Sequence, residues 1–331
     1  MDLSFPALSL KDCLKRGALV TAANWHVVLV QFVADAVFKT LLAVPIVGGV
    51  FLVVLLIGGT PGDLLTLSPS DIVPTMASVL LAQPLALLAF LIAVGLVVVG
   101  GSLLMFLVKA GTVGVLVAAE RGAGAIEHPP LRLPAFRRAT QFSLERFTSS
   151  AVQFFPRYTI LGGWLMVIYL GSTVASLVFV FAGPEATGDW RLVAAAASMA
   201  LVSWITVVNF VYLLFQIVIA TDDCSVRQAI GRVVRLLRMD TRTVLLIFLA
   251  TLGLVLLTTA ASILATVALT FIGFVPLVGL AVLPLQLIAW IMRGLVFQFI
   301  ALTALVAYVR LYRGLADAGA TTGTIELRRI G

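Results

Sequence analysis

Charged residues are scarce in this sequence. Asp, Glu, Lys and Arg together make up 11% of its 331 residues, whereas ordinary soluble domains carry about 25%. Hydrophobic residues account for 61% of the chain. This composition excludes an ordinary soluble domain and predicts a polytopic integral membrane protein.

Histidine and cysteine are also rare, although metal and nucleophile chemistry often depends on them. The only histidines are His26 and His128, and neither has the neighbouring residues that a zinc site of three or four ligands requires. The sequence lacks a phosphate-binding G-x-x-x-x-G-K-[ST], a G-x-S-x-G nucleophile motif and an H-E-x-x-H zinc pair. We therefore predict no catalytic residue, no metal site and no cofactor.

Long apolar segments are abundant instead. A helix needs roughly 20 apolar residues to cross a hydrocarbon core of about 30 Å, and without water its backbone must satisfy its own hydrogen bonds. Six segments reach this length: 40–59, 86–118, 159–182, 191–221, 243–273 and 281–311. The predicted fold class is an all-α membrane protein with six transmembrane helices in a single domain, 1–331.

The basic residues predict the orientation of these helices, because Lys and Arg in short loops are retained on the cytoplasmic side. Of the 22 Lys and Arg residues, 19 lie before the first segment, between the second and third, between the fourth and fifth, or after the sixth. The opposite loops hold Asp63, Asp71, Glu185 and Asp189, with Arg191 as their only cation. We predict a multi-pass protein of the inner (cytoplasmic) membrane with both termini cytoplasmic.

The net charge of +7 is then a signal of membrane topology. A nucleic-acid-binding protein would need a folded basic surface with base-reading or stacking groups, but here the charge is spread over four segments that flank the membrane. The predicted partners are the lipid bilayer, its anionic lipids and other membrane proteins, and not nucleic acid.

One basic stretch has a clear helical pattern. At 100° per residue, Arg227, Arg232, Arg235, Arg238 and Arg242 occupy one arc of about 140°. We predict that 224–239 forms a helix lying in the membrane interface, with its arginines toward anionic headgroups. Each arginine near such a surface contributes about 1 kcal/mol of attraction. Two interpretations remain open: a topology anchor, or specific recognition of an anionic lipid or an acidic partner.

A similar stretch recurs along the chain. The segments "DCLKR" (12–16) and "DCSVR" (223–227) share a D-C-x-x-R spacing, and "PAFRR" (134–138) places Arg137 equivalently. Each opens a basic stretch followed by two apolar segments. We predict three tandem units, 9–121, 134–222 and 223–314, each a basic surface helix plus a transmembrane hairpin. Membrane topology alone could also impose this similarity.

The segments "VIATDDCSVRQAIGRVVRLLRMDTRTVLLIFLATLGLV" (218–255) and "FIALTALVAYVRLYRGL" (299–315) resemble a family of bacterial six-helix membrane proteins. That family includes the membrane domain found beside glycerophosphodiester phosphodiesterases and its stand-alone relatives of unknown function. The resemblance implies a six-helix fold over most of the chain. It implies no phosphodiesterase activity, because the catalytic domain with its paired histidines and metal-binding carboxylates is absent.

Few charges fall within the apolar segments. Asp35 and Lys39 are four residues apart and can pair on one helix face. Lys109 and Arg293 lie deeper, and an intramembrane cation tends to face a polar interior where it can meet an anion. With Asn209 they could form an anion-binding site. The alternative is that Arg293 extends toward the membrane surface and Lys109 bonds to backbone carbonyls.

These observations lead to two classes of function. The first is a non-enzymatic integral membrane protein that binds or moves a small anionic or lipidic ligand, or that serves as a membrane subunit of a larger complex. The alternative is a membrane-embedded enzyme acting on lipid headgroups, which should display clustered carboxylates, histidines or a nucleophile at one membrane surface.

The topology can be tested by thiol labelling. Cysteines introduced near Asp63 and Gly188 should react with membrane-impermeant reagents from outside, whereas Cys13, on the predicted cytoplasmic side, should not. The reverse labelling pattern would invert the orientation.

Overall fold

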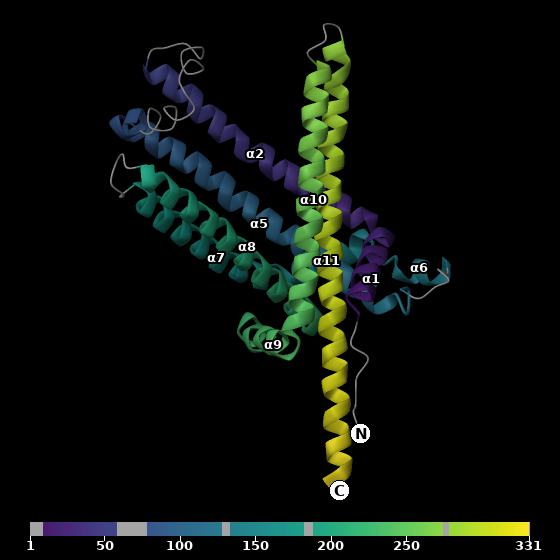
Figure 1. Ribbon diagram of the computed structural model, residues 1–331. Helices are drawn as coiled ribbons and strands as arrows, with labels where there is room; N and C mark the ends of the chain where they lie inside the picture. The colour runs from purple at the N-terminus through teal and green to yellow at the C-terminus, as the bar shows by residue number, and fades with distance from the viewer. Residues whose placement is uncertain (1–8, 58–77, 128–132, 182–187, 274–277, 331) are drawn as a thin grey trace. The chain divides into compact units, whose positions relative to one another are not determined.

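The computed structural model describes residues 9–57, 78–127, 133–181, 188–273 and 278–330 (Figure 1). Within these ranges all regular structure is helical. Six helices are long and apolar enough to cross a membrane: α2 (Trp25–Ile57), α5 (Pro84–Gly122), α7 (Leu144–Phe181), α8 (Gly188–Asp222), α10 (Thr241–Gly273) and α11 (Val278–Ile330). The chain is an all-α membrane protein, as the composition predicts. Asp63, Asp71, His128 and Glu185 lie outside the described residues.

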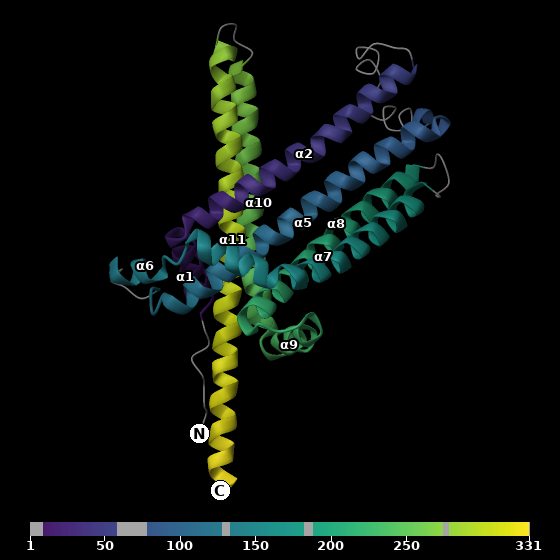
Figure 2. The ribbon, with the colours of Figure 1, turned by 180° about the vertical axis from the view of Figure 1, so that it is seen from behind.

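The helices divide between two compact units. The first comprises residues 1–32 and 109–331, and the second comprises residues 33–108. Within the first unit, α10 lies along α11 and α7 lies along α8, as both views show (Figures 1 and 2). Helix α1 (Leu10–Ala23) also packs against α11. It comes so close at Gly17 that a β-carbon there would lie 2.4 Å from the Thr303 carbonyl oxygen.

The first span begins earlier than its apolar segment predicts. Helix α2 starts at Trp25 instead of residue 40, and it continues through Asp35 and Lys39 without a break. The predicted pair forms, with Lys39 Nζ 2.7 Å from Asp35 Oδ2. Because the two charges neutralise each other along one helix face, they do not end the helix.

In the second predicted unit, the separate basic helix is short. The basic stretch is divided between a seven-residue helix α6 (Leu133–Ala139) and the first turns of α7. Ser143 starts α7 by accepting a hydrogen bond from the Arg146 amide at 3.1 Å. From there the helix runs without interruption through Pro156 into the apolar span, so the third span begins at Leu144 instead of 159.

The first and third units of the predicted repeat do share a local plan. Helix α1 and helix α9 (Val226–Met239) each have 14 residues, each follows a serine N-cap, and each precedes a helix of 33 residues. When the two helices are aligned on their N-caps, Ser9 and Ser225, Arg16 corresponds to Arg232. The D-C-x-x-R spacing instead aligns Arg16 with Arg227. The alignment of the two helices in the structure therefore differs from the alignment of the sequence motif. The threefold repeat itself stays a prediction.

Each surface helix is separated from its span by one polar residue. Asp240 ends α9, and its Oδ1 accepts the Thr243 amide at 3.0 Å at the start of α10. Asn24 ends α1. Its fully buried side chain donates to the Val20 and Ala139 carbonyls at 2.9 and 2.8 Å. The Asn24 Oδ1 accepts the amides of residues 141 and 142 at 2.9 and 3.1 Å.

We expect Asn24→Ala to destabilise the protein by about 3 kcal/mol, because it leaves several buried backbone groups without partners. Unfolding in detergent, followed by circular dichroism, measures the loss. Asn209→Ala is the matched control, since Asn209 is exposed and its side-chain oxygen accepts one hydrogen bond from Tyr169. Equal stability of the two variants would show that Asn24 does not organise this junction.

Candidate functional site

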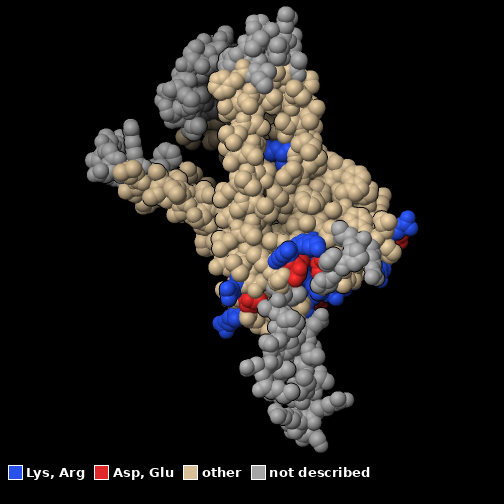
Figure 3. All heavy atoms as spheres, turned by 45° about the vertical axis from the view of Figure 1, so that its right-hand side comes forward, with Lys and Arg blue, Asp and Glu red and all other residues tan. Residues whose placement is uncertain are grey.

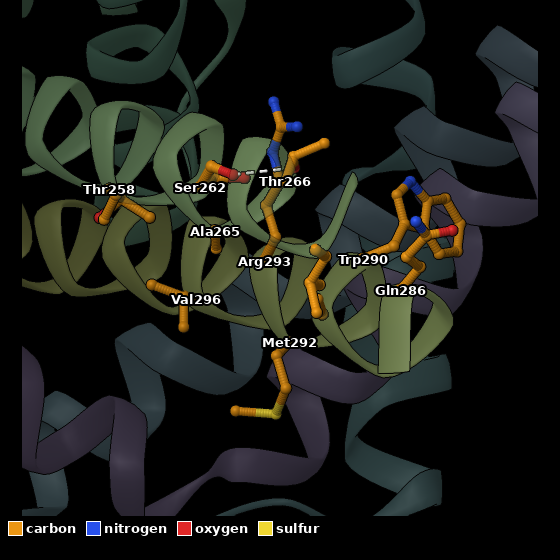
Figure 4. Close-up of a pocket in the computed structure, with 12 residues that line it drawn as sticks. Thr258, Ser262, Ala265, Thr266, Gln286, Trp290, Met292, Arg293 and Val296 are labelled. Atoms are coloured by element: carbon orange, nitrogen blue, oxygen red, sulfur yellow. Dashed lines mark hydrogen bonds between the residues drawn. The ribbon is translucent and has the colours of Figure 1, made fainter. Parts of the chain in front are cut away.

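A groove lies between α10 and α11. Helix α10 contributes Thr258, Ser262 and Thr266, which are four residues apart and therefore share one face. Helix α11 contributes its own face, formed mainly by Gln286, Trp290 and Arg293. The two faces enclose a volume of about 510 Å³ (Figure 4). A groove with this many polar side chains is unusual within an apolar span.

Arg293 is the charged residue of the groove. Figure 4 shows its side chain rising from α11 past Ser262 and Thr266 of the neighbouring helix. The Thr266 hydroxyl donates to the Ser262 carbonyl at 2.8 Å, and its oxygen can still accept hydrogen bonds. The guanidinium carbon also lies 5.6 Å from the centre of the Phe297 ring. Arg293 thus has polar neighbours in place of pure hydrocarbon.

The position of Arg293 within a span makes this placement costly. The candidate span runs from Pro284 to Ala316, so at 1.5 Å per residue Arg293 lies about 14 Å from the first of these residues and about 35 Å from the second along the helix. Ionisable residues within membrane spans are rare, and they usually line a substrate path or a polar cavity. An exposed guanidinium in a groove within an apolar span is therefore a candidate binding group.

The structure does not bring the other two predicted ligand-binding residues to this groove. Lys109 Nζ lies 5.3 Å from the centre of the Tyr212 ring on α8. Asn209, one turn before Tyr212 on the same helix, accepts a hydrogen bond from Tyr169 at 2.5 Å. Neither lines the groove between α10 and α11. The shared site of Lys109, Asn209 and Arg293 stays a prediction.

A second polar assembly lies at the basic end of the spans. We name it the inner charge cluster, and it consists of Arg16, Glu120, Glu127, Arg310 and Arg313. Glu120 is fully buried, and it accepts hydrogen bonds from Arg16 Nε at 3.0 Å and from Arg313. Arg16, only 3% exposed, also bonds to Glu127 at 2.6 Å. Arg310 lies 3.6 Å from the same Glu127 carboxylate. Three guanidinium groups therefore surround two buried carboxylates.

These contacts favour the ionised form of the Glu127 carboxylate. Burial by itself raises the pKa of Glu127, but the backbone hydrogen bond and the charge of Arg16 outweigh it, so the pKa is lowered. A carboxylate held this way is a structural anion. It is not poised to exchange protons near neutral pH.

No local sequence pattern predicts this cluster. Its arginines were counted as topology cations, and Glu120 and Glu127 are separated from Arg16 by more than 100 residues. The available signal was the two glutamates themselves, which stand in an otherwise basic region at the end of the second span. Acidic residues there suggest a partner for nearby arginines.

A similar set of pairs involves the end of α8. Asp222 lies 2.5 Å from Arg232 and accepts the Tyr312 hydroxyl, while Asp223 pairs with Arg157. Figure 3 shows that charged side chains on one face gather mostly in one band, beside a surface formed almost entirely of other residues.

The basic helix itself is confirmed as a separate element, α9, which ends before Asp240. Its apolar side is only partly available to a membrane, because Ala229, Val233 and Leu236 are buried within the protein. The Arg232 guanidinium forms an ion pair with Asp222. The remaining arginines predicted to face headgroups are exposed: Arg227, Arg235, Arg238 and Arg242.

Both cysteines are free and buried. Burial raises the pKa of Cys13 to about 11 and also raises that of Cys224. A buried thiol with a high pKa reacts slowly on either side of a membrane. Failure of Cys13 to react would therefore report its burial and not the membrane topology. A cysteine introduced at Arg137, which is exposed on α6, is a better probe of the side predicted to be cytoplasmic.

Within the part of the chain that the structure describes, no group of three or more His, Cys, Asp and Glu residues could hold a metal ion. Comparison with protein-family models, curated proteins and solved structures gives no match to the chain.

The inner charge cluster can be tested by removing its central cation. We expect Arg16→Gln to destabilise the protein by about 3–5 kcal/mol, because breaking a buried pair leaves an uncompensated charge. Arg137→Gln is the matched control on exposed helix α6 and should change stability by less than about 0.5 kcal/mol. Denaturant unfolding in detergent measures both variants, and equal stabilities would contradict the cluster's role.

Proposed function

We propose that this protein binds an anionic amphiphile, a lipid or a lipid-like molecule, in the groove between α10 and α11. The single observation behind the proposal is Arg293, an exposed guanidinium within an apolar span, in a groove that also carries neutral polar side chains. Binding would occur in the inner membrane with both termini cytoplasmic, as the distribution of cations indicates.

The chemistry of the groove favours an anion. A guanidinium forms paired, charge-assisted hydrogen bonds with phosphate or carboxylate, and these are about twice as strong as neutral ones. Thr258, Ser262 and Gln286 add neutral polar groups around it. An anionic group at this position would offset the cost of placing Arg293 in the membrane.

The surroundings favour an amphiphile over a small soluble anion. The volume of about 510 Å³ is within the roughly 300–1,000 Å³ of small-molecule sites. Large exposed apolar side chains line the groove itself, among them Trp290 and Met292. A ligand with hydrocarbon chains could therefore enter sideways from the bilayer and keep its chains against these residues.

The alternative function, an enzyme acting on lipid headgroups, has less support. The buried carboxylates at the basic end, Glu120 and Glu127, are both paired with arginines. This pairing suits structure better than acid–base catalysis. The proposed relation to the six-helix membrane domain beside glycerophosphodiester phosphodiesterases rests on residues 218–255 and 299–315, and it is compatible with a binding role.

Replacing Arg293 tests the proposal. We expect Arg293→Gln to weaken binding of a phosphatidylglycerol by at least about tenfold, since loss of a charge-assisted bond costs about 1.5–3 kcal/mol. Arg293→Lys should bind with intermediate affinity because it keeps the charge but loses the fork of donors. Native mass spectrometry of the purified protein, titrated with the lipid, measures the affinities.

Two controls sharpen this experiment. Arg138→Gln removes a cation from exposed helix α6 and should leave binding unchanged. Phosphatidylcholine, which has no net charge, should not distinguish wild type from Arg293→Gln. Membrane insertion of Arg293→Gln should be normal or improved, because the translocation machinery disfavours arginine within a membrane span. Unchanged phosphatidylglycerol affinity in Arg293→Gln would refute the proposed function.

A further inference from the structure

A second polar groove lies at the basic end of the spans, away from Arg293. It is formed by α5, α7, α8 and the segment before α7, and it has a volume of about 570 Å³. We name it the inner polar groove. The side chains that matter are Arg121, Gln141, Arg146, Ser150 and Gln153. None of these was singled out as a ligand-binding residue by the sequence.

Contacts within the groove hold both arginines in place. Arg121 donates to the Thr221 carbonyl at 2.5 Å, which ties the end of α5 to the end of α8. Arg146 donates to the Gln141 backbone carbonyl at 3.2 Å and to its side-chain oxygen. A guanidinium has five N–H donors. These bonds therefore position the two cations and leave capacity to bind a ligand.

The inner polar groove carries an excess of positive charge. Its one acidic lining residue is Asp223, and that carboxylate already pairs with Arg157. In the inner charge cluster, by contrast, two buried carboxylates offset the arginines. Arg121 and Arg146 thus form a concave cationic site without a carboxylate of their own.

The walls of the groove are close-packed at its base. A β-carbon added at Gly114 of α5 would lie 2.4 Å from the β-carbon of Ser150 on α7. This contact brings the Ser150 hydroxyl beside α5, on the same groove as the two arginines. Gln153, one turn further along α7, adds an amide with two more donors. The site therefore combines two cations with neutral hydrogen-bond donors.

We propose that the inner polar groove binds a phosphate ester through Arg121 and Arg146. Guanidinium groups match phosphate oxygens in paired geometry, and Ser150 and the two glutamines can satisfy further oxygens. Arg121 is the penultimate residue of α5, which places the groove at the level where lipid headgroups lie. The phosphate belongs either to an anionic lipid or to a free ester. This site goes beyond the Arg293 groove and does not depend on it.

The test uses the full-length protein in detergent and two probes, dihexanoyl phosphatidic acid and glycerol 3-phosphate. We expect Arg121→Gln/Arg146→Gln to weaken binding of the phosphate ester at least tenfold. The matched control is Arg137→Gln/Arg138→Gln, which removes two exposed cations from the same inter-span region without touching the groove. Thermophoresis measures affinity, and unfolding temperatures establish that both double variants are folded.

The two probes identify the source of the phosphate. Binding of phosphatidic acid without competition by glycerol 3-phosphate indicates a lipid headgroup, and equal binding indicates a soluble ester. Arg293→Gln should leave glycerol 3-phosphate affinity unchanged, so failure of one site is distinguishable from failure of the other. The proposal is overturned if wild type binds neither probe, or if, in an Arg293→Gln background that removes the other groove's cation, the Arg121/Arg146 variant binds as tightly as the control.

Discussion

Burial of Glu120 is the constraint on which the basic end of this protein depends. A carboxylate with no exposed surface needs close cationic partners to offset the loss of its hydration, and Arg16 and Arg313 supply them. Arg16 comes from the surface helix α1, and Arg313 comes from the last span. Glu120, near the end of α5, therefore joins helices α1 and α11. At the end of α8, Asp222 and Asp223 make ion pairs with Arg232 and Arg157, but these pairs are exposed.

Ion pairs with carboxylates distinguish two groups of arginines in this protein, those paired within the fold and those proposed to bind a ligand. Some arginines meet a carboxylate within the protein, as Arg16 and Arg232 do. Arg293, Arg121 and Arg146 differ, because they line grooves whose other polar groups are neutral or already paired. In a membrane of anionic lipids, these are the positions where a ligand can supply the missing negative charge. The protein thus has one candidate anion site within a span and another at its basic end.

Sequence reasoning reached the fold class because each span carries its own signal, namely length and apolar composition. It also placed α9, whose capping box at Ser225 and Gln228 stops it from merging with α8. It missed the early start of α2 and α7, since polar residues such as Asp35 and Ser150 do not end a helix by themselves. Above all it missed Arg16 with Glu120, because a contact between residues 104 positions apart leaves no local pattern.

The central claim, that buried charge pairs hold the ends of the hairpins together, is tested most directly by a double-mutant cycle. Glu120→Gln, Arg313→Gln and the double variant are compared with wild type by denaturant unfolding in detergent. The account predicts a coupling energy of about 1–3 kcal/mol between the two residues. A coupling near zero, with the two single losses simply adding, would mean that Glu120 and Arg313 do not depend on each other and would contradict it.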